Sequence, residues 1–225
     1  MRVVLFGATG MIGEGALIEC LEDDRVTAVL SLGRRPSGHT HAKLTELQHS
    51  DFGDLSSIQE QLSGFDACLY CLGISSSGMS EEKYRRITYD FSVEAGRALL
   101  AENPEMRLCF ISGAGSDAGS RTMWARVKGE AEQAMLGMPW KSAHMFRPAM
   151  IEPKKGVVSG VRSYRIYYSY FGWTMPLFKA VAPNSITSTD RLGQAMIQVA
   201  FEGHSKSVLE GQDINGMAGA RTTLG

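Results

Sequence analysis

Residues Val3–Leu17, VVLFGATGMIGEGAL, carry an apolar run followed by glycines at intervals of three. The run predicts a buried strand, and the residues after it begin a helix. Glycine at a strand end permits a tight turn and a close approach of a pyrophosphate, and a third glycine lets helix and strand pack closely. The helix N-terminus offers free N–H groups and its positive dipole end. The stretch predicts a dinucleotide-binding loop, with a structural glycine turn as the alternative; its candidate residues are Gly7, Thr9, Gly10, Met11, Ile12 and Gly13.

Beyond this loop, short apolar runs alternate with helical periodicity. The predicted strands are Val3–Phe6, Thr27–Leu32, Leu44–Gln48, Ala67–Leu72, Leu108–Ser112 and Ala143–Phe146. The predicted helices run over Met11–Leu21, up to Leu62, over Ser80–Ala101, Thr122–Leu136 and Asp190–Phe201. Such alternation predicts right-handed crossovers and a parallel sheet covered on both faces. The predicted fold class is therefore a doubly wound, Rossmann-like α/β fold.

The composition is typical of one soluble globular domain over residues 1–225. Its 44% hydrophobic and 21% charged residues exclude a disordered chain, and a net charge of -1 argues against a nucleic-acid partner. No secretory signal is expected at the N-terminus. Membrane binding is not expected either, because Gly172 and Pro176 interrupt the longest aromatic stretch. Four cysteines suit a reducing compartment, so a cytoplasmic location is predicted.

Two of these cysteines, Cys68 and Cys71, form a C-x-x-C inside the apolar run ACLYCLG. Residues three apart on a strand point to opposite faces, so the two thiols should diverge. A redox or zinc role needs them together. We therefore expect buried core cysteines.

Arginines follow the second predicted strand, in the stretch LSLGRRPS. An acidic residue there would hold the ribose 2′-hydroxyl of NAD, but this chain has Arg34 and Arg35. Two guanidiniums would bind a 2′-phosphate, so NADP(H) is the predicted cofactor; the alternative is two arginines that are solvated on a loop. After the third strand, Asp51 and Phe52 are candidates for contact with adenine.

Six motifs in order make a family resemblance: GATGMIG, GRRP, CLG, FISGAGSD, WARVKGEAE and FRPAMIEP, spread over roughly residues 1–153. The chain resembles the atypical and extended short-chain dehydrogenase/reductase superfamily, and within it most the Tat-interacting-protein-like NAD(P)H-binding proteins. The resemblance implies that Cys71, Leu72 and Gly73 pass beside the adenine ribose. It also implies a small C-terminal subdomain that covers the substrate.

The resemblance further implies a catalytic set. Ser112 matches the serine that polarises a substrate carbonyl, and Lys128 matches the lysine that holds the nicotinamide ribose. The position of the proton-transferring tyrosine is taken by Trp124. The plainer alternatives are that Ser112 caps a strand exit and that Lys128 pairs with Glu132 at helical spacing.

Because Trp124 stands in the position of the tyrosine, the proton-transfer step of the family cannot be assumed for this chain. A phenol can exchange a proton with a developing alkoxide, whereas an indole N–H is only a hydrogen-bond donor. Trp124 could hydrogen-bond a carbonyl or stack on a ring. Tyr84 or Tyr89 on the long predicted helix could supply a phenol instead.

The segment at approximately 150–190 is irregular and rich in aromatic residues between positions 164 and 178. By resemblance it forms a substrate lid, suited to an apolar or aromatic compound. A core or dimer-interface helix is an equal alternative, and a membrane-surface segment a weaker one. His39, His41 and His49 match no metal pattern, so no metal is predicted.

Two functions from different classes follow. The first is an NADPH-dependent oxidoreductase with a modified active site, acting on a small carbonyl or quinone-like substrate. The second is a catalytically silent NADP(H)-binding sensor that acts through a partner. A sugar-nucleotide epimerase is less favoured, because no larger C-terminal domain is expected. A homodimer is a reasonable expectation.

Overall fold

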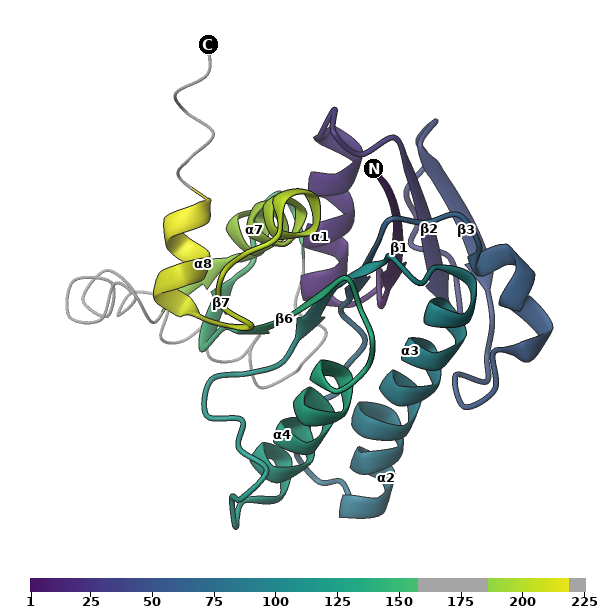
Figure 1. The fold of residues 1–225 in the computed structure, drawn as a ribbon. Coiled ribbons are helices and arrows are strands. Elements are labelled where there is room, and N and C mark those ends of the chain that lie inside the picture. The colour runs from purple at the N-terminus through teal and green to yellow at the C-terminus, as the bar shows by residue number, and fades with distance from the viewer. Residues whose placement is uncertain (158–185, 219–225) are drawn as a thin grey trace.

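A seven-stranded parallel sheet forms the centre of the molecule (Figure 1). The computed structural model describes residues 1–157 and 186–218. The strand order is β3-β2-β1-β4-β5-β6-β9, and every neighbouring pair is parallel. The strands are β1 (Arg2–Phe6), β2 (Ala28–Gly33), β3 (Leu44–Gln48), β4 (Ala67–Tyr70), β5 (Arg107–Ile111), β6 (Ser142–Arg147) and β9 (Val208–Glu210). The predicted doubly wound α/β fold is confirmed.

Helices cover both faces of this sheet (Figure 1). One face carries α1 (Met11–Glu22), α7 (Thr189–Glu202) and α8 (Gly211–Met217). The other carries η1 (Ser56–Leu62), α2 (Glu81–Arg85), η2 (Arg86–Asp90), α3 (Phe91–Glu102) and α4 (Met123–Leu136). Among the described helices, none is long and apolar enough to cross a membrane.

Strand β1 shows why its sequence is an unbroken apolar run. Val3 and Leu5 pack toward α1 and α7, whereas Val4 and Phe6 pack toward α3 and η1. All four side chains are fully buried. Because successive side chains on a strand alternate between faces, a strand covered on both sides needs apolar residues at every position.

The helical predictions differ from the structure in local geometry. The segment predicted to end a helix at Leu62 is the 3₁₀ helix η1. The long helix predicted from Ser80 does begin there, and the Ser80 side chain accepts a hydrogen bond from the Lys83 N–H at 3.5 Å. A π-helical turn, η2, lies inside this long helix. Single-turn π segments are not visible in side-chain periodicity.

Strand β4 ends at Tyr70, two residues before the predicted end at Leu72. The Cys71 N–H still donates to the Phe6 carbonyl oxygen at 3.0 Å, so the chain leaves the sheet just after this bond. Cys68 packs in the α3 side of the core and Cys71 against the α1 side. Both are free thiols, and they diverge as predicted.

The sequence did not predict β9 and α8, nor a second, two-stranded parallel sheet formed by β7 (Met150–Glu152) and β8 (Ile186–Ser188). Strands of three residues carry too little periodicity to be recognised. The pair β7–β8 joins the two ends of the predicted lid. The aromatic residues between positions 164 and 178 lie outside the described residues.

Candidate functional site

The carboxyl ends of four neighbouring strands bring most of the predicted site residues to one edge of the sheet. Parallel strands end at the same edge, and β2, β1, β4 and β5 lie side by side in that order. Arg34 follows β2, Gly7 follows β1, Leu72 lies just beyond β4 and Ser112 follows β5. The chain winds outward from β1 to β3 and then returns to β4 on the other side of β1. This reversal is the switch point at which doubly wound folds bind ligands.

The turn after β1 depends on two glycines. Gly7 has φ +85°, and a Cβ there would lie 2.8 Å from the backbone of Cys71 and Leu72. A Cβ on Gly13 would lie 2.0 Å from the Gly7 carbonyl oxygen. No side chain fits at either position, so the first helix can pack this closely onto the turn only with glycine at both.

Gly10 has a different role in the same loop. It caps α1, donates its N–H to the Gly7 carbonyl oxygen at 2.9 Å, and accepts the Glu14 N–H at 2.7 Å. The amides of Met11, Ile12 and Gly13 precede this first helical bond. Among the described residues, a Cβ on Gly10 would meet only the Gly7 oxygen, at 3.4 Å. Gly10 is therefore open on its outer side, where an anion can approach the first amides of α1.

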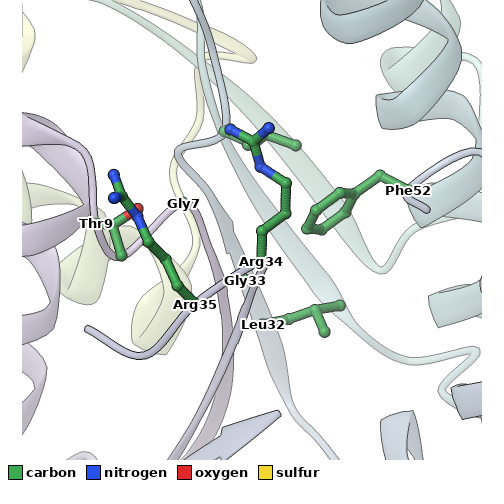
Figure 2. Close-up of a pocket in the computed structure, with 8 residues that line it drawn as sticks. Gly7, Thr9, Leu32, Gly33, Arg34, Arg35 and Phe52 are labelled. Carbon is green, nitrogen blue, oxygen red and sulfur yellow. The ribbon is translucent and has the colours of Figure 1, made fainter. Parts of the chain in front are cut away.

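A pocket of about 390 Å³ lies in front of this loop. It is lined by Gly7, Thr9, Leu32, Gly33, Arg34, Arg35, Phe52 and Leu72. Figure 2 shows the Arg35 side chain extended toward Thr9, and Arg34 extended between Gly7 and Phe52. Both arginines are exposed. Within residues 1–157 and 186–218 neither guanidinium has an ion-pair or hydrogen-bond partner, so both can bind an anion in the pocket.

Of the two residues predicted to contact adenine, Phe52 lines the pocket. Its side chain is 3% exposed, and its ring centroid lies 6.2 Å from that of Phe6 and 5.9 Å from that of Phe91. Asp51 is exposed, and its Oδ1 accepts the Gly53 N–H at 3.0 Å. Phe52 is thus the apolar wall of the pocket, while Asp51 fixes the turn beside it.

The residues after β4 form the next part of the edge. Leu72 lines the pocket. Gly73 is exposed, and in the described part of the chain nothing lies within 4 Å of an added Cβ. Cys71 lies beneath them, and burial raises the pKa of its thiol well above the ordinary value. It therefore contributes backbone and packing at this position and not a thiolate.

Ser112 lies at the end of β5, and a second serine contacts it. Ser112 is buried, its N–H donates to the Phe146 carbonyl oxygen at 2.8 Å, and its Oγ lies 2.9 Å from Ser116 Oγ. Ser116 is also buried and donates its hydroxyl to the Gly113 carbonyl oxygen at 2.8 Å. Ser116 was not among the residues predicted from the sequence. Its position four residues after Ser112, in a glycine-rich loop at a strand end, was the available signal.

Lys128 on α4 is half-buried and close to this loop. Its Cδ lies 3.9 Å from the point that a Cβ on Gly113 would occupy. Desolvation lowers the pKa of its amine to about 8, opposed by the negative charge of Glu132. Glu132 itself binds Arg147, whose Nε and Nη2 donate to the two carboxylate oxygens at 2.8 and 2.5 Å. The alternative in which Lys128 forms an ion pair with Glu132 is therefore not what the structure shows.

Trp124 lies one helical turn before Lys128 and faces the same loop. Its Cη2 atom lies 3.7 Å from the position of a Cβ on Gly115. Tyr84 is 2% exposed, and burial raises the pKa of its phenol. Tyr89 contacts the guanidinium of Arg85, with Cζ 4.4 Å from the ring centroid. The structure thus places Trp124 beside the Ser112 loop, while Tyr84 belongs to the helix packing.

Over the described ranges, no group of three or more His, Cys, Asp or Glu side chains lies close enough to hold a metal ion. His39 lies 3.7 Å from the Glu14 carboxylate, and His49 Nε2 lies within 2.8 Å of the carbonyl oxygens of Asp51 and Asp54. These histidines stabilise loops near the pocket.

No protein-family model matches the chain. Among curated proteins it is similar to the mitochondrial protein fmp52 of Emericella nidulans, with 26% identity over 157 residues, which is 67% of this chain and 66% of that protein. The mitochondrial protein FMP52 of Candida albicans is 23% identical over 90% of this chain and 89% of its own length. Protein HTATIP2 of Rattus norvegicus is 23% identical over 66% of this chain and 62% of its own length.

Solved structures show the same fold. A short-chain dehydrogenase/reductase family oxidoreductase from Burkholderia thailandensis matches with a TM-score of 0.70 and 13% identity, covering 96% of this chain and 93% of that one. MoeE5 in complex with UDP-glucuronic acid and NAD matches with a TM-score of 0.70 and 16% identity, covering 93% of this chain and 75% of that one. With the relative HTATIP2, these matches confirm the resemblance inferred from the sequence.

The predicted cytoplasmic location is wrong by this comparison. The fungal relatives are named as mitochondrial proteins. The prediction depended on free cysteines, which persist in any compartment that keeps thiols reduced. That criterion does not distinguish one reducing compartment from another.

Proposed function

We propose that the chain binds NADP(H) and uses it to reduce a small carbonyl or quinone-like compound in a modified short-chain dehydrogenase/reductase site. The observation that carries the proposal is the pocket in front of β1 and β2. Two glycine positions that no Cβ could occupy shape its turn, and two exposed arginines without partners in the described chain line its outer part. A diphosphate fits the first feature, and an adenosine 2′-phosphate fits the second.

The residues present fit an NADP(H) molecule laid across the strand ends. The first amides of α1 would bind the diphosphate, Arg34 and Arg35 the 2′-phosphate, and Phe52 and Leu72 the adenosine. The nicotinamide would then lie over the end of β5, where Lys128 can hydrogen-bond its ribose. The bound cofactor would supply a hydride. Ser112 and Trp124 would orient the substrate oxygen.

The relatives and solved structures support a nicotinamide cofactor in general. The choice of NADP(H) over NAD(H) rests on the arginines, since a carboxylate is the usual partner of an unphosphorylated ribose. Titration of the protein with NADPH and with NADH, followed by cofactor fluorescence, tests this directly. We expect NADPH to bind at least tenfold more tightly. Equal affinities would contradict the proposal.

Trp124 favours a second candidate, a silent NADP(H) sensor read by a partner protein. Indole cannot ionise, and loss of a general acid typically lowers a rate by about 10²–10⁴-fold. The two functions differ in one measurement. A sensor binds NADPH without oxidising it in the presence of aldehydes or quinones, whereas the reductase consumes it. A homodimer stays a prediction, which the molar mass in solution would test.

A further inference from the structure

Reduction of a carbonyl at the proposed site needs a side chain that donates a proton. The hydrogen bonds at the end of β5 show which of the nearby side chains can do so. This inference rests on the proposed function. A hydroxyl carries one hydrogen. Ser116 gives its hydrogen to the Gly113 carbonyl oxygen at 2.8 Å, so in the 2.9 Å contact between the two serines Ser112 must be the donor. Ser112 can turn its hydroxyl from Ser116 to a substrate oxygen as a hydrogen-bond donor, but a serine hydroxyl does not ionise in a useful range, so it orients a carbonyl without being its proton source.

Within residues 1–157 and 186–218, the aromatic side chains beside this loop do not supply a proton either. The Trp124 N–H can donate a hydrogen bond but does not ionise in a useful range. Tyr84 is 2% exposed, so a substrate has no access to its phenol. Burial also raises the pKa of Tyr84, which is the opposite of the change that a proton donor near neutral pH needs.

Lys128 differs from these groups in having a mobile proton. Its stem lies along Gly113, the residue next to Ser112, and its amine has no ion-pair or hydrogen-bond partner among residues 1–157 and 186–218. The carboxylate at helical spacing from it, Glu132, is held by the Arg147 guanidinium through both oxygens. A half-buried ammonium without a bound carboxylate is poised to release its proton.

We propose that Lys128 is the catalytic acid of this site and donates its proton directly to the oxygen of the substrate carbonyl. The carbonyl carbon receives the hydride that NADPH supplies, and the oxygen takes the electron pair of the broken C=O π bond. The N–H bond of Lys128 breaks as the new O–H bond forms. The products are an alcohol, NADP⁺ and a neutral amine, which water reprotonates. Trp124 and Ser112 position the carbonyl and remain unchanged.

A pH dependence distinguishes this assignment from a role in cofactor binding alone. Reduction requires the charged form of Lys128, whose pKa is lowered to about 8 from the ordinary 10.5. The rate of reduction should therefore fall as the pH rises through about 8. A lysine that only holds the ribose would instead weaken NADPH binding as the pH rises through this value and leave the single-turnover rate at saturating NADPH unchanged.

The test uses three variants of the full chain. Lys128→Arg keeps the positive charge and a donor for the ribose but cannot release a proton, because a guanidinium stays protonated in proteins. Lys128→Met removes the charge as well. Lys141→Met is the matched control, since Lys141 is an exposed lysine 3.5 Å from Glu105 and far along the chain from the loop. The probes are NADPH with 4-nitrobenzaldehyde and with 9,10-phenanthrenequinone.

Two readouts are needed. The first is the single-turnover rate of NADPH oxidation between pH 6 and pH 10, together with the dissociation constant of NADPH. The second is independent of turnover: ¹³C NMR titration of reductively methylated protein, with the Lys128 signal assigned by its loss in Lys128→Met. We expect this signal to titrate near 8. We expect Lys128→Arg to bind NADPH within a few-fold of wild type and to lose about 10²-fold or more in rate.

The outcomes separate the two proposals. If NADPH binds and is oxidised, but Lys128→Arg retains the wild-type rate, the acid role is wrong and the proposed function stands. The same holds if the Lys128 signal titrates near 10.5. If NADPH binds and none of the probes is reduced, both the reductase function and the acid role of Lys128 are wrong, and the sensor function is supported. Failure to bind NADPH overturns the proposed function itself.

Discussion

Arg147 on β6 binds both carboxylate oxygens of Glu132 on α4, at 2.8 and 2.5 Å. Glu132 is 3% exposed and lies four residues after Lys128, at the spacing where an intrahelical ion pair would form. Because the guanidinium binds both oxygens, Glu132 is not ion-paired with Lys128 in the described part of the chain, and the Lys128 stem lies near Gly113 in the loop after β5. The ion pair between Arg147 and Glu132 thus also leaves Lys128 without a bound carboxylate partner in the described part of the chain.

Replacing Glu132 by Gln should therefore change both stability and titration. Without Glu132, Arg147 keeps the longer contact of its Nη1 with Glu210 at 3.4 Å, so we expect the free energy of unfolding to fall by about 3 kcal/mol, the lower end for a broken buried pair. The pKa of Lys128 should fall further, because the charge of Glu132 raises it. Urea unfolding and the NMR titration measure the two effects. Glu105→Gln, in the exposed pair with Lys141, should change stability by less than about 1 kcal/mol.

Replacing Arg34 and Arg35 by Ala should weaken NADPH binding selectively. Each guanidinium is expected to make charge-assisted hydrogen bonds to the 2′-phosphate, worth about 1.5–3 kcal/mol, so each single variant should lose roughly tenfold or more in affinity. NADH affinity should stay within a few-fold. Arg97→Ala, at an exposed arginine of α3, is the control. An equal loss for both cofactors would show that the arginines do not recognise the 2′-phosphate.

Gly10→Ala and Gly13→Ala form a matched pair within the first loop. The added methyl at position 13 would lie 2.0 Å from the Gly7 carbonyl oxygen, a clash with backbone that we expect to destabilise the protein by about 3 kcal/mol. At position 10 it would lie 3.4 Å from the same atom and point outward. Gly10→Ala should fold with near wild-type stability and lose NADPH affinity. Thermal unfolding and cofactor titration distinguish the two variants. Wild-type NADPH affinity in Gly10→Ala would show that the diphosphate does not bind at the first turn of α1.

The lowered pKa of Lys128 predicts a pH dependence of stability. Between about 8 and 10.5 the unfolded chain holds a proton on this amine that the folded chain has released. The free energy of unfolding must then rise with pH across this window, since the unfolded state binds more protons. Below pH 8 the burial of the charge opposes folding in full. The difference between wild type and Lys128→Met, measured by urea unfolding from pH 7 to pH 10.5, should show this rise; a flat difference would contradict it.

Trp124→Tyr should increase the rate of carbonyl reduction. It places a phenol one helical turn from Lys128, where a nearby ammonium can lower the phenol's pKa, and a general acid of this kind contributes about 10²–10⁴-fold. The measurement is single-turnover oxidation of bound NADPH with the two probes. Trp124→Phe is the control that removes the indole N–H without adding an acid. A wild-type protein faster than Trp124→Tyr would show that the indole assists the reaction.

The sequence was most informative where one residue type is required by backbone geometry. Gly7 and Gly13 were predicted correctly as the turn and the close-packing glycine, because no side chain fits at either position. The apolar run of β1 was equally clear, since both of its faces are buried. Short elements such as β7 and β9, of three residues each, left no readable pattern.

By itself the sequence determined the doubly wound α/β fold and the loop after β1, because strand and helix periodicities and glycine spacing are local properties of the chain. Only the tertiary structure decided which side chains interact at the site. The Ser112–Ser116 hydroxyl pair and the capture of Glu132 by Arg147 depend on how strands, helices and loops approach one another in space. Helical spacing predicted that Lys128 would pair with Glu132, four residues away. Arg147 on β6 instead binds that carboxylate through two hydrogen bonds, because the fold brings β6 beside α4.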